Sequence, residues 1–141
     1  MEAVKKIYEA VKGFNPCELF KGDEDFNRMM EIFTSPQGIE FCLKHNVLNS
    51  AVFEAIEGLS LARWGVYVDA GQKRLQNERL AVLIGDCDFD LEYDTLVHPC
   101  KVVLFNGARA RVKASGYSVV RVEKQDGCEC EVTITDSAIV R

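Results

Sequence analysis

The 141-residue sequence has little of what the common enzyme and membrane motifs require. It contains two histidines, His45 and His98, and neither belongs to a catalytic triad or a Cys-His signature. No glycine-rich turn joins a strand to a helix, so the pattern of a phosphate-binding loop is missing. No apolar run is long enough to cross a bilayer, and the first residues form no apolar signal-peptide core. We therefore expect a cytoplasmic protein with no membrane partner.

An excess of positive charge is also missing, because 17 basic residues stand against 22 acidic ones and the net charge is −5. Nucleic-acid-binding proteins gain most of their affinity from basic residues that release counterions from phosphates. The charge balance therefore argues against a nucleic-acid partner. One alternating basic row, Arg109, Arg111 and Lys113, keeps salt-sensitive nucleic-acid binding open as a minor alternative.

What the chain does contain is an ordinary globular composition, with 48% hydrophobic and 28% charged residues. That much apolar surface can offset the entropy cost of ordering the chain. The length is close to the commonest size of one domain. We expect a single domain, 1–141, made of a helical subdomain, 1–60, and a β subdomain, 61–141.

The first 60 residues show the spacing of short amphipathic helices. Residues 2–12 put Val4, Ile7, Tyr8 and Val11 on one stripe, followed by Gly13 as a terminator. A second helix opens at Asp23 as N-cap and carries Phe26, Met29, Met30 and Phe33. A third follows the Ser35-Pro36 cap and runs to Asn46, and Ser50 to Ile56 can form a fourth. The expectation is three to four short helices.

After about residue 61 the period changes from helical to alternating. Apolar residues then alternate with charged or polar ones, which is typical of half-buried strands. Three apolar rows show this best: Cys87, Phe89, Leu91 and Tyr93; Ala108, Ala110, Val112 and Ala114; and Cys128, Cys130, Val132 and Ile134. The fold class predicted is therefore α+β, with a helical part followed by β-structure.

A weak internal repeat runs through the β half, with the pattern apolar, any, apolar, small or polar, Gly or Asp. Its copies begin at Val66, Val82, Leu91, Val103, Val112 and Val132, at steps that are one or two units of about ten residues. Short strands at this spacing form either an antiparallel sandwich or a β-solenoid. Small residues recurring at equivalent corners favour the β-solenoid, and the antiparallel sandwich is the alternative.

Two stretches carry a family resemblance, Ala108 to Gly116 and Val132 to Val140. Their alanines and valines resemble the rungs of bacterial and phage-type β-solenoid repeat proteins, and the likeness is best between Val103 and Val140. The resemblance carries no catalytic signature. It implies a scaffold or a binding surface, with the helical half capping one end of the coil.

The most acidic stretch of the sequence is an alternating row of carboxylates, Asp86, Asp88, Asp90, Glu92 and Asp94. Like charges on one strand face need neighbouring cations, and Arg109, Arg111 and Lys113 have the same period. We expect the two rows to pair as neighbouring strands. The sharper alternative is a calcium loop, but Leu91 replaces the glycine and Val97 the glutamate that an EF-hand requires. A cation site of another kind stays open.

Three thiols and an imidazole, from His98, Cys100, Cys128 and Cys130, would suffice for tetrahedral zinc. The spacing differs from that of a zinc ribbon, because Cys128 and Cys130 alternate within a strand instead of forming a Cys-x-x-Cys knuckle. We interpret most of the six cysteines as buried thiols in a reducing compartment. Neither a metal nor another cofactor is predicted.

The leading hypothesis for function is a non-enzymatic scaffold or protein-interaction module. The alternative is a metal- or thiol-dependent enzyme or metal-binding protein that uses His98, Cys100, Cys128 and Cys130. Arg63, Trp64 and Tyr67, at the junction of the two halves, form a possible binding surface, although such aromatics more often pack subdomains together.

Self-association is predicted from the C-terminal stretch Val132 to Val140, taken as one final strand. No proline or helix follows it that could cover its edge, and exposed edges invite pairing with another chain. We expect a homo-oligomer, most simply a dimer joined through this strand.

Overall fold

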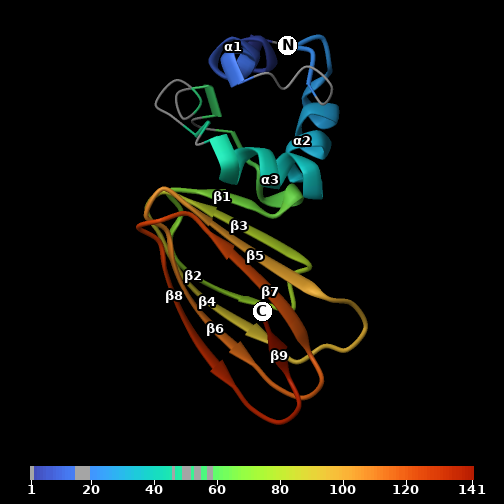
Figure 1. Cartoon of the computed structure of the whole chain (residues 1–141), viewed down its shortest axis with the longest axis vertical. Helices are drawn as coiled ribbons and strands as arrows, with labels where there is room; N and C mark the ends of the chain where they lie inside the picture. The colour runs from blue at the N-terminus through green and yellow to red at the C-terminus, as the bar shows by residue number, and fades with distance from the viewer. Residues whose placement is uncertain (1, 15–19, 46, 49–51, 53–54, 57–58) are drawn as a thin grey trace. The chain divides into compact units, whose positions relative to one another are not determined.

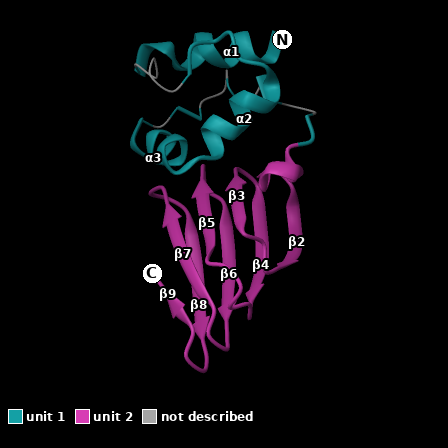
Figure 2. Cartoon of the chain, turned by 90° about the vertical axis from the view of Figure 1, so that its right-hand side faces the viewer, with its two compact units in different colours: residues 1–60 teal, residues 61–141 magenta. Residues whose placement is uncertain are grey.

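The computed structural model describes residues 2–14, 20–45, 47–48, 52, 55–56 and 59–141. The chain divides into two compact units, Met1–Ser60 and Leu61–Arg141, shown in different colours in Figure 2. The first contains helices, and the second contains parallel strands (Figure 1). None of the described helices is long and apolar enough to cross a membrane. The single folding unit 1–141 stays a prediction.

The helices of unit 1 whose bounds lie within the described residues are α1 (Glu2–Val11), α2 (Phe26–Thr34), α3 (Pro36–His45) and a short 3₁₀ helix, η1 (Lys12–Phe14). The predicted stripe of α1 is buried at Val4, Ile7 and Val11. Phe20, which is fully buried, packs edge-on against Tyr8 and Phe33, with ring centroids 5.6 and 5.2 Å apart. The helical period in the sequence thus identifies the apolar faces.

The helix starts follow side-chain capping. Asp25, and not Asp23, is the N-cap of α2, because its carboxylate accepts a hydrogen bond of 2.7 Å from the backbone N–H of Arg28. At α3 the prediction is confirmed: the Ser35 hydroxyl accepts from the N–H of Gly38 at 3.1 Å, and Pro36 is the first helical residue. In the predicted fourth helix, Val52, Ala55 and Ile56 are helical, and the rest of Ser50–Ile56 lies outside the described residues.

Unit 2 is a β-solenoid of about four turns that opens with a 3₁₀ turn, η2 (Ala62–Trp64). Successive strands belong alternately to two parallel sheets, in the orders β1-β3-β5-β7-β9 and β2-β4-β6-β8. The strands are β1 (Val66–Val68), β2 (Gly71–Gln76), β3 (Leu80–Ile84), β4 (Cys87–Tyr93), β5 (Cys100–Phe105), β6 (Arg109–Ala114), β7 (Val119–Lys124), β8 (Glu129–Ile134) and β9 (Ile139–Val140). The sandwich alternative is therefore excluded, since every strand pair is parallel.

The ten-residue repeat in the sequence is half a turn of the coil. Val66 pairs with Val82, Val82 with Val103, and Val119 with Ile139, so a full turn takes 16, 21 or 20 residues. Each turn contributes one strand to each sheet. The stretch from 70 to 80, where the repeat is hard to recognise, contains β2, whose residues are mostly exposed and polar.

The solenoid interior is filled by the apolar rows that the alternation predicts. On β4, Cys87, Phe89, Leu91 and Tyr93 are buried, and the intervening acids are only partly so. Alanines of β6 stand next to the large rings of β4, with Phe89 beside Ala110 and Tyr93 beside Ala114. Large and small side chains in adjacent rungs thus share one packed core.

The corners of the coil use residues with positive φ. Gly85, Gly107, Gly116 and Gly127 have φ between 62° and 89°, and Asp136 has φ 58°. Non-glycine residues at such angles are stabilised here by hydrogen bonds between rungs. Asp136 accepts from the N–H of Gly116 at 3.1 Å, one turn earlier.

Candidate functional site

The outer face of the β2-β4-β6-β8 sheet is a ladder of charges, which we name the charge ladder. Its four strands contribute Gln72, Arg74 and Gln76; Asp88, Asp90 and Glu92; Arg109, Arg111 and Lys113; and Glu129, Glu131 and Thr133. Register places Asp88 opposite Arg109, Asp90 opposite Arg111 and Glu92 opposite Lys113. The predicted pairing of the acidic row with the basic row is confirmed.

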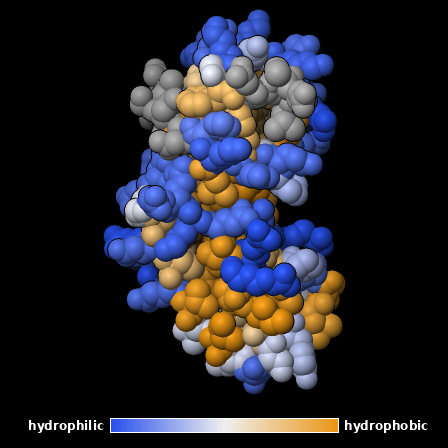
Figure 3. Space-filling view, in the orientation of Figure 1, coloured by the Kyte–Doolittle hydropathy of each residue, from blue (hydrophilic) through white to orange (hydrophobic). Residues whose placement is uncertain are grey.

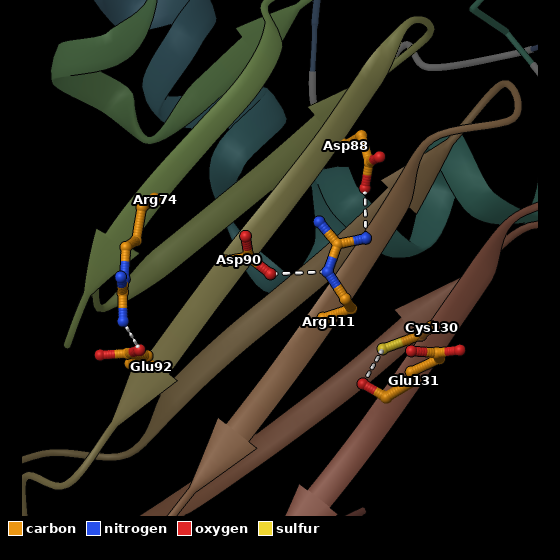
Figure 4. Close-up of polar contacts among 7 residues, drawn as sticks. All are labelled: Arg74, Asp88, Asp90, Glu92, Arg111, Cys130 and Glu131. Atoms are coloured by element: carbon orange, nitrogen blue, oxygen red, sulfur yellow. Dashed lines mark hydrogen bonds and ion pairs between the residues drawn. The ribbon is translucent and has the colours of Figure 1, made fainter.

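Arg111 is the centre of the charge ladder. Its Nη1 lies 2.7 Å from Oδ1 of Asp88, and its Nε lies 2.6 Å from Oδ1 of Asp90 (Figure 4). The hydrogen bond from Arg111 lowers the pKa of the Asp90 carboxyl, and the two carboxylates raise the pKa of the guanidinium. Arg74 forms a second ion pair on this face, with Glu92. Cations of the chain thus neutralise much of the acidic row.

The charge ladder, as described, does not form a metal-binding site. Within the described residues, no group of three or more histidine, cysteine, aspartate or glutamate side chains is placed to hold a metal ion. Asp88 and Asp90 face a guanidinium instead, and neither Leu91 nor Val97 supplies an EF-hand ligand. The arrangement is chemically a mixed-sign polar surface.

The predicted zinc ligands come together only in part. His98, in the loop before β5, and Cys100, the first residue of β5, do meet, with 3.6 Å between Nδ1 and Sγ. Cys128 and Cys130 belong to the corner before β8 and to β8 itself, and they do not join this pair within the described residues. Burial raises the pKa of the Cys100 and Cys130 thiols, so both are neutral near pH 7. A neutral buried thiol is a poor nucleophile.

The three residues predicted as a binding surface are placed in two different environments. The Arg63 guanidinium stacks over the Trp64 ring, 4.7 Å from its centroid, within η2. Tyr67 turns into the solenoid, where its ring packs edge-on against Phe89 at 5.2 Å between centroids. Arg63 and Trp64 therefore form a stacked pair, whereas Tyr67 is part of the core packing.

The stretch Val132 to Val140 is not one strand, which corrects the sequence prediction. It forms the end of β8, a corner at Thr135 to Ala138, and β9. β8 pairs with β6, and β9 pairs with β7. The sequence did contain a sign of this corner, because Thr135-Asp136 fits the corner position of the repeat. In the structure, Asp136 has the positive φ of a corner residue.

The other side of β8 and β9 carries no strand of the described chain, and we name this side the terminal edge. Leu91, Val112 and Val132 occupy one row of the interior, and their exposed fractions are 1%, 1% and 43%. Ile134 is 49% exposed, although Ala114 in the same row is 1% exposed. Figure 3 shows apolar side chains gathered where Figure 1 places β9, whereas the β8–β9 corner is pale or hydrophilic. The terminal edge thus presents core-type side chains to solvent.

Comparison of the chain with protein-family models, with curated proteins and with solved structures gives no match. What the chain shares with β-solenoid proteins is the architecture: parallel strands, two sheets and about four stacked turns. The fold therefore places the second unit in the β-solenoid class. Its function has to be argued from its own residues.

Proposed function

We propose that the protein is a non-enzymatic scaffold or protein-interaction module that binds through the terminal edge. The observation that carries the proposal is the exposure of Val132 and Ile134, which occupy rows that are buried on β4 and β6. Ile139, on the outer face of β9, adds a third exposed apolar side chain. Covering these three residues would remove apolar area from water, which drives protein association.

The backbone of β8 supports the same proposal. The N–H groups of Glu129 and Thr135 donate to Ala108 and Ala114 across the β6 side. In a parallel ladder alternate residues bond to opposite sides, so the N–H groups of Cys130, Val132 and Ile134 point to the open side. Unpaired groups of this kind accept an added strand.

The same proposal covers the partner and the location. A homo-oligomer, most simply a dimer, is the simplest association through one exposed edge, and another protein is the alternative occupant. A cytoplasmic location is supported by Cys42, Cys87, Cys100, Cys128 and Cys130, which are all free thiols.

The proposal is tested by blocking the edge without breaking the fold. Val132→Pro removes an N–H that points away from β6, and proline is tolerated at sheet edges. Val132→Ala is the matched control, because it keeps that N–H. A photo-crosslinking amino acid is placed at Ile134, with a second version at the exposed outer-face residue Arg109 for comparison.

In cells, the Ile134 probe should give a discrete protein adduct that the Arg109 probe does not give. The adduct should be lost in the Val132→Pro background and kept in the Val132→Ala background. An adduct that survives Val132→Pro, or the absence of any adduct from Ile134, would overturn the proposal.

One observation favours a second candidate, a metal- or thiol-dependent protein. The 3.6 Å separation of His98 Nδ1 and Cys100 Sγ would fit two ligands of one tetrahedral zinc ion. Metal analysis of protein purified without chelator tests it. Stoichiometric zinc that is lost in Cys100→Ser and Cys128→Ser would replace the scaffold proposal, whereas metal-free protein would leave the scaffold proposal in place.

A further inference from the structure

The first strand of the β2-β4-β6-β8 sheet pairs on one side only. β2 pairs with β4, and no strand of the described residues lies on its other side, which we name the leading edge. The N–H of Gly71, the first residue of β2, donates to the carbonyl of Asp86 at 2.9 Å, on the β4 side. In a parallel ladder alternate residues bond to opposite sides, so the N–H groups that point to the leading edge are those of Gln72, Arg74 and Gln76. The leading edge therefore has the backbone groups that an added strand would bind.

One inward-facing row of the coil ends at the leading edge on a charged residue. In register from β2 to β8, this row consists of Lys73, Phe89, Ala110 and Cys130. Phe89 and Ala110 are 0% and 3% exposed. Lys73 is exposed, and it forms no ion pair with a described residue. The other three members of the row are apolar side chains or a thiol, so none of them supplies a counter-charge.

A strand added at the leading edge would enclose Lys73 in this row. Its ammonium group would then leave water for a row without a carboxylate, and burial of an unpaired charge is strongly unfavourable. The neighbouring inward row shows the edge without such a charge. There Leu75 continues the row of Leu91 and Val112, which are both 1% exposed. Lys73→Leu would give the leading edge two adjacent apolar rows.

We infer that Lys73 prevents strand addition at the leading edge, and that the strand it excludes belongs to a second copy of this chain. The chain's own strands have the alternation of apolar and polar side chains that fits this edge, as in β4 and β6. Inward-pointing charges are one of the devices by which sheet proteins avoid edge-to-edge pairing. β1, the first strand of the other sheet, has only three residues and offers little backbone to an added strand.

This inference goes beyond the proposed function, because the leading edge lies at the opposite end of the sheet from the terminal edge. Its test is the self-association of full-length variants, measured by sedimentation and light scattering between about 1 and 100 µM, a range on the order of moderate dimer affinities. Lys73→Leu should form species larger than the largest species of the parent protein. Its association constant should be at least about tenfold higher, because an apolar side chain replaces a charge in the row. Lys73→Arg keeps the charge and should behave like the parent protein.

Two further variants separate strand addition from general stickiness. Gln72→Leu places the same apolar side chain on the neighbouring residue, which faces outward, and it should not assemble. Gln76→Pro, added to Lys73→Leu, removes an N–H that points to the leading edge, and proline is tolerated at sheet edges. The double variant should therefore return to the oligomeric state of the parent protein. All these positions are exposed, so the variants should keep its circular dichroism spectrum.

Three results would overturn the inference. The first is a folded Lys73→Leu variant that keeps the oligomeric state of the parent protein. The second is assembly of Gln72→Leu to the same extent as Lys73→Leu, which would show that added apolar surface alone causes association. The third is assembly of Lys73→Leu that persists with Gln76→Pro, which would show that the association does not use the backbone of the leading edge.

Discussion

The Nε of Arg111 lies 2.6 Å from Oδ1 of Asp90, and the two residues occupy the same register position on the neighbouring strands β4 and β6. The two strands are separated in the chain by the whole of β5, so this contact exists only because the coil has closed one turn. The pair therefore reports on folding of the solenoid, and not on local structure.

The first prediction concerns acid stability. Arg111 lowers the pKa of Asp90 below the value near 3.9 of an unfolded aspartate, so its contribution to stability is present above that pH. The contribution is lost as the pH falls through the lowered pKa. In Arg111→Gln the pKa of Asp90 should rise toward its ordinary value, and the acid transition should begin at a higher pH than in the parent protein.

Thermal unfolding between pH 2 and 7, roughly the range that carboxylates titrate, measures this difference. Arg109→Gln is the control, because Arg109 lies on the same strand and forms no ion pair with a described residue. It should leave the acid transition in place. Coincident acid transitions for Arg111→Gln and the parent protein would contradict the assignment.

The second prediction separates an ion-pair ladder from a cation site. Asp88→Asn with Asp90→Asn should lower the melting temperature by no more than about 4 °C, because exposed ion pairs contribute little. Calcium should have no effect on the melting temperature of the parent protein. A large rise with calcium that disappears in the asparagine variant would instead establish a cation site on β4.

The third prediction uses two corner glycines with nearly the same φ. A Cβ on Gly85 (φ 77°) would lie 2.2 Å from Oδ1 of Asp69, whereas a Cβ on Gly107 (φ 81°) meets no atom within 4 Å. Both alanine variants carry the strain of a positive φ, about 1 kcal/mol. Gly85→Ala must also displace the Asp69 carboxylate, which accepts a 2.7 Å hydrogen bond from the N–H of Asp86.

We therefore expect urea denaturation to give a loss of about 1 kcal/mol for Gly107→Ala and about 2 to 3 kcal/mol for Gly85→Ala. The difference between the two variants isolates the contact from the backbone strain. Equal losses would show that Asp69 moves away without cost.

The fourth prediction is that residues 1–60 do not fold alone. The helices α1, α2 and α3 are 10, 9 and 10 residues long, and helices of this length are marginal in water without an apolar partner surface. The isolated fragment should show weak helical circular dichroism and no cooperative thermal transition. A cooperative melt would divide the chain into two independent domains and contradict the prediction of one.

Local structure could be predicted from the sequence, because hydrophobic period and helix capping act over a few residues. The 3.6-residue stripe of α1 and the alternation of Cys87, Phe89, Leu91 and Tyr93 identify which faces are buried. The matching periods of the acidic and basic rows were enough to predict that they pair. The prediction of Asp23 as the N-cap of α2 was wrong, because Asp25 is the N-cap. Both residues are plausible caps, and only the backbone geometry selects one.

Which strands are neighbours, and which edge of the described strands is unpaired, follows from long-range contacts and could not be predicted from the sequence. A ten-residue repeat is compatible with half a turn of a parallel coil and with one strand of an antiparallel sandwich, and long-range hydrogen bonds choose between them. The same bonds split Val132 to Val140 into β8 and β9, in two different sheets. They also leave Val132 exposed where Leu91 and Val112 are buried, because its row ends at the terminal edge.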